Sequence, residues 1–433
     1  MVLWILVFIF AGISCNVKNE TEPPDEPANA PQVREAWKKW IKKNHYEIHS
    51  LEANDTEFSD LRFLKNLIGS RRLVQLGESS HGVSEFNKAK VRLIKFLHEK
   101  MGFNVIAFES GLYECFITNE NGDSLSDLKM MKNSIFGVWH CSETLELFKY
   151  IKETRNTSQP LILAGFDIQL STLAGIQGRP QMFQSIISKI DPVYADKVMA
   201  QDTEFIDKTY KDRDWIVKEK ENIIAFYTQL TQWFDSRMAD LIRFYPDNPR
   251  LLFVLRQSAW SMPLYTEEIV ELENHKIAYN IRDKGMADNI GFLLNTLYPN
   301  EKIINWAHNY HVMHGVSEFD SGVDNMGYWI SQRHRSDLYT IGLVMYEGKN
   351  ALNNREIIDL KPAPDDSLEA IMYYTGKNFS FVNLLNQHIT SENSWMTEKI
   401  YCEEWGQYNY KVTPQKQYDG IFFVKTVNPP NYL

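Results

Sequence analysis

The chain has 433 residues, of which 44% are hydrophobic and 13% aromatic, so it is long enough for two or three domains with a well-formed core. Its formal net charge of −10 excludes nucleic acid as the main partner, because binding to a phosphate backbone needs a basic face. A neutral or cationic small molecule is compatible with this charge.

The first fifteen residues have the composition of an export signal. Residues 3–10 are apolar, a length typical of the hydrophobic region of a signal peptide and too short to span a bilayer comfortably. The sequence Ala11-Gly12-Ile13-Ser14-Cys15 resembles the cleavage site of bacterial lipoproteins, with Cys15 as the lipidated residue, although no Lys or Arg precedes the apolar run. Residues 16–32 are rich in Asn, Glu and Pro and are expected to form a disordered tether. We therefore predict an exported lipoprotein of the cell envelope, with an ordinary secretory signal or an uncleaved anchor as the alternative.

Helix and strand patterns alternate after the tether. Apolar residues at helical spacing predict helices over 33–43 and 61–68, a third that is capped by Ser84 and ends at Gly102, and a fourth over 143–152. Short apolar runs predict buried strands at 73–76, 105–108 and 161–166. Strands that alternate with helices in this way are typical of a parallel sheet.

Each of these three strands ends in an acid. Glu78 and Glu109 follow the first two strands, and Asp167 follows the third. Because parallel strands have their carboxyl ends at the same edge of a sheet, we expect the acids to lie along one edge, where open α/β sheets bind ligands.

The strand signal is absent between about residues 180 and 300, where helical spacing continues throughout. This region is predicted to be an all-helical insertion domain of four or five helices, the last of which opens near Arg282. Strand patterns return at 302–307, 338–345 and 420–424. The predicted fold is therefore α/β, with a mostly parallel central sheet flanked by helices. Residues 33–179 and 301–433 form the α/β domain, and residues 180–300 form the insertion.

Glu78 and His81 form the first candidate site. A neutral histidine accepts a proton from water and later returns it, and a nearby carboxylate fixes its tautomer and stabilises the imidazolium. Glu78 lies three residues before His81, so one tight turn brings them together. The alternative interpretation is a helix cap beside a structural histidine.

A second group of histidines, His308, His311 and His314, follows the strand at 302–307. Their spacing of three places them on roughly one face of a helix, as metal ligands often are. Otherwise His308 and His311 are hydrogen-bonding groups that face the same cleft as His81, and His314 is a helix or surface residue. The Gly-x-Ser-x-Gly motif of serine hydrolases is absent, so the chemistry most available is direct attack by a histidine-activated water.

Three stretches resemble motifs of the erythromycin esterase family: Gly77-Glu78-Ser79-Ser80-His81-Gly82-Val83-Ser84-Glu85-Phe86, Gly102-Phe103-Asn104-Val105-Ile106-Ala107-Phe108-Glu109 and Trp306-Ala307-His308-Asn309-Tyr310-His311. The resemblance implies an α/β domain and a helical domain with a deep cleft between them. It also implies hydrolysis of a macrolactone ester without a covalent enzyme intermediate.

The resemblance also implies roles for single residues. His81 would be the general base, Glu78 its partner and Glu109 a second acid of the cleft, with His308 and His311 completing the site. Lys90 falls where family members carry an arginine and would be the cation of the cleft, although lysine offers a point charge in place of a bidentate fork. Residues expected to contact the substrate are Lys90, His311, Asn309 and Asp167.

Three functions remain open. The first is a hydrolase that opens the lactone of erythromycin-like macrolides and so confers resistance, with no metal or other cofactor. The second is a metal-dependent hydrolase of another ester or of a peptide, using His308, His311 and the strand-end acids. The third is a surface binding module without catalysis, which the lysine at position 90 keeps under consideration.

Overall fold

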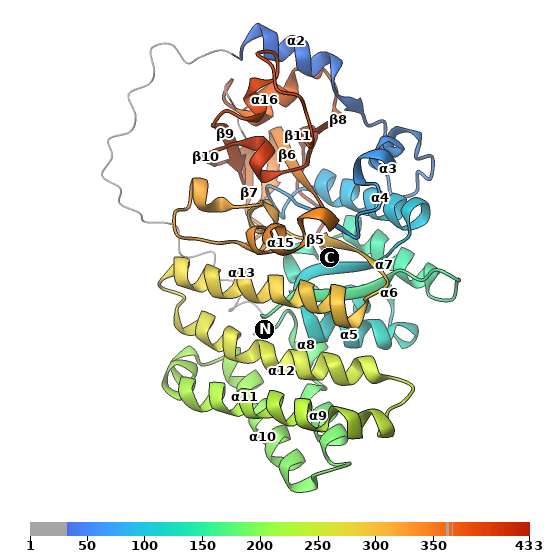
Figure 1. Cartoon of the computed structure of the whole chain (residues 1–433), viewed down its shortest axis with the longest axis vertical. Coiled ribbons are helices and arrows are strands. Elements are labelled where there is room, and N and C mark those ends of the chain that lie inside the picture. The colour runs from blue at the N-terminus through green and yellow to red at the C-terminus, as the bar shows by residue number, and fades with distance from the viewer. Residues whose placement is uncertain (1–32, 361–362, 366) are drawn as a thin grey trace.

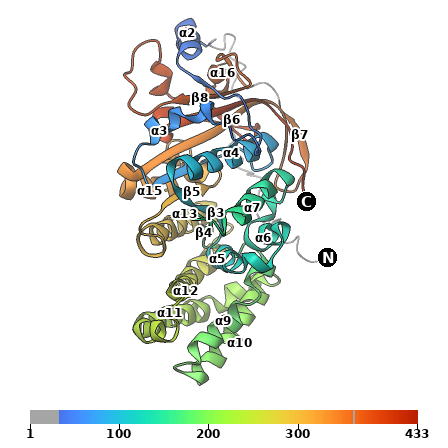
Figure 2. The ribbon, with the colours of Figure 1, turned by 90° about the vertical axis from the view of Figure 1, so that its right-hand side faces the viewer.

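The computed structural model describes residues 33–360, 363–365 and 367–433. The expected signal segment, 1–15, and the tether, 16–32, lie outside the described residues. An α/β part occupies one end of the molecule and a stack of helices the other (Figure 1), and the view turned by 90° shows the same division (Figure 2). No helix in the described ranges is both long and apolar enough to cross a membrane.

The α/β part is built on one large sheet. Strands β11, β6, β2, β5, β3 and β4 run parallel in this order, while β8 and then β1 pair antiparallel beyond β11, and β7 pairs antiparallel with β6. The bounds are β1 (Tyr46–Glu47), β2 (Leu73–Leu76), β3 (Phe103–Gly111), β4 (Ile162–Asp167), β5 (Lys302–Trp306), β6 (Leu338–Ala351), β7 (Ile357–Leu360), β8 (Phe379–Asn383) and β11 (Gly420–Val427). A separate hairpin consists of β9 (Ile400–Glu404) and β10 (Tyr408–Val412). The mostly parallel sheet confirms the predicted fold class.

Alternate strand residues enter two hydrophobic clusters, because successive side chains of a strand point to opposite faces. Val74 and Leu76 of β2 pack in the cluster that contains helix α4, whereas Leu73 and its neighbour Ile303 belong to the cluster that extends into the helical stack. The sheet is therefore covered on both faces, as a parallel sheet requires.

The helices of the first segment are α2 (Glu35–Lys43), α3 (Phe63–Ile68), α4 (Ser84–Met101), α5 (Leu112–Glu120), α6 (Asp127–Ser134) and α7 (Ser142–Thr154). Helix α4 ends at Gly102, whose φ of 71° is the left-handed conformation that glycine adopts easily. Ser84 is not the cap that we expected. Val83 precedes the helix, and the Ser84 hydroxyl instead donates to Glu143 at 2.8 Å.

Between β4 and β5 the chain forms α8 (Leu173–Ile176), α9 (Arg179–Ile187), α10 (Pro192–Thr209), α11 (Arg213–Phe244), α12 (Pro249–Val270) and α13 (His275–Phe292). The expectation that the last of these helices opens near Arg282 is wrong. Helix α13 begins seven residues earlier, at His275, and Arg282 lies in its middle. In the polar run that suggested a helix start, Arg282 and Asp283 are buried and paired with other site residues, whereas Lys284 is exposed.

The rest of the chain forms α14 (Asn309–Val312), α15 (Met326–His334), α16 (Leu368–Tyr373) and α17 (Pro414–Gln417). The sequence indicated the core strands β5, β6 and β11 but none of β7, β8, β9 and β10. These later strands are short or lie at edges, so their apolar pattern is weak.

Candidate active site

The loop after β2 is fixed by close backbone contacts with its neighbours. Ser79 N–H donates to the carbonyl of Leu343 on β6 at 3.1 Å, so the loop continues the sheet. A Cβ on Gly82 would overlap the carbonyl oxygen of Ala351, and one on Gly77 would overlap the Asn309 side chain. Only glycine fits at these two positions, which explains the Gly77–Gly82 frame of the motif.

Glu78 and His81 are paired as the sequence predicted. His81 Nδ1 lies 2.7 Å from Glu78 Oε1, which also accepts a hydrogen bond from the Trp139 indole at 2.7 Å. Although burial acts to raise the pKa of Glu78, Lys90 and His81 outweigh it and lower this pKa. The ionised carboxylate keeps the proton of His81 on Nδ1 and leaves Nε2 as the basic atom.

Lys90 lies behind Glu78 and is not a cation of an open cleft. Its side chain is fully buried, with Nζ 2.8 Å from Glu78 Oε2 and donating to the carbonyl of Ala307 at 3.1 Å. Burial lowers the pKa of Lys90 to about 8, although the nearby Glu78 acts to raise it. Lys90 is therefore too deeply buried for the expected contact with a substrate. Its role is to support Glu78, because the ammonium group balances the charge of that carboxylate.

His308 lies beside His81, because β5 is inserted between β2 and β3 in the sheet. The two imidazole rings have centroids 4.9 Å apart. The backbone N–H of His308 donates to Glu109 Oε2 at 3.0 Å. The ring atom Nδ1 of His308 accepts from the backbone N–H of Tyr310 at 3.3 Å. Burial lowers the pKa of His308 well below its ordinary value, and His81 acts in the same direction. The ring is therefore neutral, with its proton on Nε2.

The cation at the strand ends is Arg282 of α13. Its Nη2 lies 2.9 Å from Glu109 Oε1 and 2.5 Å from Asp167 Oδ2. Burial acts to raise the pKa of Glu109, but His311 and Arg282 lower it well below its usual range. The strand-end acids Glu109 and Asp167 thus meet as expected, through an arginine that the sequence analysis had not assigned to the site.

His311 is held between two acids. Its Nδ1 lies 2.8 Å from Asp283 Oδ1, and its Nε2 lies 3.3 Å from Glu109 Oε1. Burial acts to lower the pKa of His311, but Asp283 and Glu109 outweigh it and raise this pKa. His314 instead contacts Thr340 Oγ1 at 3.0 Å. The three histidines therefore have different partners, and no group of three potential ligands within the described ranges is arranged to hold a metal ion.

Asn309 is fully buried and supports the two loops. The backbone N–H of Asn309 donates to the backbone carbonyl of Glu78 at 2.8 Å, and its side-chain amide donates to the backbone carbonyl of Leu343 at 3.0 Å. The structure thus places Asn309 where it fixes Glu78, away from any surface that a substrate could reach.

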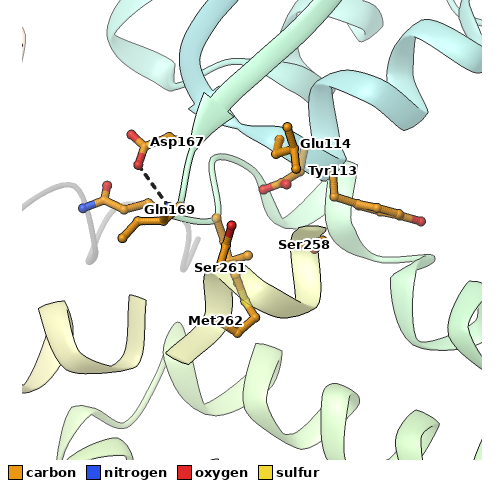
Figure 3. A pocket seen from close by; sticks show the side chains of 10 residues that line it. Tyr113, Glu114, Asp167, Gln169, Ser258, Ser261 and Met262 are labelled. Atoms are coloured by element: carbon orange, nitrogen blue, oxygen red, sulfur yellow. Dashed lines mark hydrogen bonds between the residues drawn. The ribbon is translucent and has the colours of Figure 1, made fainter. Parts of the chain in front are cut away.

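Asp167 lines a small hollow between the end of β4 and helix α12, together with Tyr113, Glu114 and Gln169 (Figure 3). The hollow has room for about one water molecule. Asp167 is enclosed and paired with Arg282, so here too the expected substrate contact is corrected to a supporting position. This hollow is far smaller than the deep cleft that the resemblance implied.

The β9–β10 hairpin adds two residues that the sequence did not indicate: Glu404 at the end of β9 and Trp405 in the turn. The Trp405 indole stacks on His308 with centroids 5.2 Å apart and meets His81 edge-on at 5.3 Å. Glu404 Oε2 lies 3.2 Å from His308 Nε2, and its other oxygen accepts from the Tyr410 hydroxyl at 2.6 Å. Burial raises the pKa of Glu404 well above its ordinary value, so this acid is neutral beside His308.

The erythromycin esterase family model matches residues 98–427, beginning after Glu78 and His81. The Bacillus subtilis (strain 168) protein named "Putative hydrolase YbfO" is 30% identical over 423 residues, and the match covers 93% of each chain. Erythromycin esterase type II of Escherichia coli is 22% identical, over 90% of this chain and 97% of its own length.

Solved structures share the fold at low sequence identity. A succinoglycan biosynthesis protein superimposes with a TM-score of 0.78 at 19% identity, over 94% of this chain and 100% of that one. A histidine-to-asparagine variant of the erythromycin esterase EreC, in its open conformation, gives a TM-score of 0.64 at 18% identity, over 88% of this chain and 97% of its own.

Proposed function

The chain belongs to the erythromycin esterase family, and on this premise we propose that it hydrolyses the lactone ester of erythromycin-like macrolides. One observation carries the proposal. His81 has its Nδ1 held by Glu78, while its Nε2 makes no hydrogen bond within the part of the chain that the structure describes. The His81 side chain is 12% exposed, so this basic atom is accessible to a water molecule at the surface of the site.

The geometry supports direct attack by water. His81 Nε2 takes a proton as the water oxygen bonds to the ester carbonyl carbon, and Glu78 stabilises the resulting imidazolium. In this proposal the Nε2–H of neutral His308, on the adjacent ring, donates to the oxyanion of the tetrahedral intermediate, and the ring turns away from Glu404 Oε2, 3.2 Å from Nε2, to do so. When the intermediate collapses, the carbon–oxygen ester bond breaks and His81 returns its proton to the leaving alkoxide. The product is a single ring-opened hydroxy acid, which carries the new carboxylic acid and the released hydroxyl group.

The substrate is the finer part of the proposal. YbfO is named as a hydrolase without a substrate, and the Escherichia coli relative that is named for erythromycin is only 22% identical. The macrolide is chosen because that relative aligns over 97% of its length. Export through residues 1–15 and a lipid anchor at Cys15 are part of the same proposal.

The test is incubation of the purified protein with erythromycin, other macrolides and simple esters, followed by mass spectrometry. We expect a macrolide product that is heavier by one water. His81→Ala should be inactive. The control His388→Ala removes an exposed histidine outside the candidate site and should retain activity. If the protein turned over only simple esters, the proposed substrate would change from a macrolide to another ester. If it bound a macrolide without turnover, the protein would be a binding module.

A further inference from the structure

The turn of the β9–β10 hairpin has an unusual backbone for its sequence. Trp405 and Gly406 both have positive φ, 59° and 62°. Hairpin turns that need two successive residues in this conformation strongly favour Asn-Gly or Asp-Gly, because a bulky side chain at positive φ clashes with its own backbone. Gly406 fits this rule and Trp405 breaks it. A large aromatic residue at this position therefore has a reason outside the conformational preference of the turn.

The strained turn is tied to the loop that carries Glu78 and His81. Trp405 N–H donates to the carbonyl of Ser79 at 2.7 Å. The carbonyl of Trp405 accepts from the Asn350 side chain at 2.9 Å, and the same amide group lies 3.2 Å from the Ser80 hydroxyl. The backbone of Trp405 is thus fixed on both sides relative to the loop after β2, which restricts where its indole can lie.

The indole is directed at the two histidines. It stacks on the His308 ring with an interplanar angle of 20°, and it meets His81 at 79°. Trp139 contacts His81 as well, at a centroid distance of 4.9 Å and an angle of 82°. His81 therefore lies against two indoles and the His308 ring. Of the two indoles, that of Trp139 also donates a hydrogen bond to Glu78.

We propose that Trp405 is a positioning residue for His81 and His308, and that the strained hairpin turn serves to direct its indole at both rings. The inference rests on the proposed hydrolysis, because it concerns the base of that reaction. Without the indole, rotation of His81 about its last side-chain bond is less restricted, and Nε2 is directed at the attacking water for a smaller fraction of the time. Mispositioning of this kind lowers the rate of the chemical step more than it weakens substrate binding.

The turn itself offers a variant that separates the two roles of this residue. Trp405→Asn places at positive φ the side chain that such turns favour, so the hairpin should not be weakened. We expect its midpoint of thermal unfolding to equal or exceed that of the wild type. Its kcat should fall about tenfold or more, with KM within about twofold. Trp405→Phe retains a ring and should recover most of the lost kcat.

Tyr408→Asn is the matched control, because it removes an aromatic side chain that is 58% exposed from the same hairpin. It should keep the wild-type kcat. The inference is overturned if Trp405→Asn keeps the wild-type kcat, or if only KM rises. It is equally overturned if Trp405→Asn lowers both the unfolding midpoint and kcat, and Trp405→Phe restores neither quantity. The indole would then act only in packing.

Ring-carbon NMR signals of His81 and His308 test the inference independently of turnover. In Trp405→Asn they should broaden as the rings sample more orientations, and they should sharpen again in Trp405→Phe. Sharp, unchanged signals in Trp405→Asn would contradict positioning by the indole. A wild-type protein that turns over no ester would instead contradict the proposed function, so the two failures are distinguishable.

Discussion

Lys90→Met tests the assignment of Lys90 as the buried partner of Glu78. Neither side chain of this pair is exposed, and Nζ lies 2.8 Å from Oε2. Methionine keeps much of the apolar stem but removes the charge. Removal of one partner from a buried ion pair destabilises a protein by about 3–5 kcal/mol, because the remaining charge is left uncompensated. We expect Glu78, enclosed beside Trp139, to cause a loss of this size.

The expected loss converts into a measurable shift in the unfolding midpoint. With an unfolding entropy of roughly 2.1 cal/mol/K per residue, about 400 residues give about 0.8 kcal/mol/K, so the midpoint should fall by about 4–6 °C. Thermal unfolding at pH 7, followed by circular dichroism, measures it. Lys88→Met is the matched control on the same helix, since its 3.0 Å pair with Glu52 is partly exposed and should contribute under about 1 kcal/mol.

The double variant Lys90→Met/Glu78→Gln should unfold at a higher temperature than Lys90→Met alone, because the buried carboxylate is then removed as well. The reasoning is refuted if Lys90→Met lowers the midpoint no more than Lys88→Met does. It is also refuted if the effects of Lys90→Met and Glu78→Gln are additive, since groups in direct contact should be coupled.

Three further predictions follow from single contacts. Glu78→Gln should lower kcat by roughly a hundred- to ten-thousand-fold in steady-state assays, because the imidazolium of His81 loses its counter-charge, and an unchanged kcat would contradict this role. The pKa of His311 is raised, so its stabilising contribution is fully present below its ordinary pKa of 6.5 and is lost as pH rises through the higher folded value. The difference in unfolding free energy between wild type and His311→Gln, from urea titrations, should therefore be larger at about pH 6 than at about pH 9, and a constant difference would be inconsistent with the raised pKa. Gly82→Ala should cost about 1–3 kcal/mol in the same titrations, because its Cβ would overlap a backbone oxygen, whereas Gly178→Ala, with no atom within 4 Å, is the control; equal effects would argue against close packing of the loop.

The parts of the site that the sequence predicted are those that follow from local pattern. Glu78, Glu109 and Asp167 each end a recognisable buried strand, and parallel strands bring such ends to one edge. The position of His308 beside His81 depends on the insertion of β5 between β2 and β3. Strand order depends on contacts between distant segments, so the sequence pattern alone does not determine it.

The sequence was sufficient to predict that Lys90 lies on the buried side of its helix. It is four residues after Phe86 and three before Leu93, both of them buried, so helical periodicity places it on the apolar face. Arg282 and Trp405 gave no comparable signal. Charged residues within a long helix are usually solvated, and a single tryptophan in an irregular segment is usually part of the core. Their roles depend on partners from other segments of the chain: Glu109 and Asp167 for Arg282, and His81 and His308 for Trp405.

The central claim is that His81 activates water for direct attack on a macrolactone ester. Its most direct test is a quenched reaction of the purified protein with erythromycin in water enriched in the heavy oxygen isotope, with product and protein both analysed by mass spectrometry. We predict that the wild type and His388→Ala release a product that carries one solvent oxygen, that the protein mass stays unchanged throughout, and that His81→Ala gives no product. Product release by His81→Ala at the wild-type rate, or an acylated form of the protein in the quenched sample, would contradict the claim.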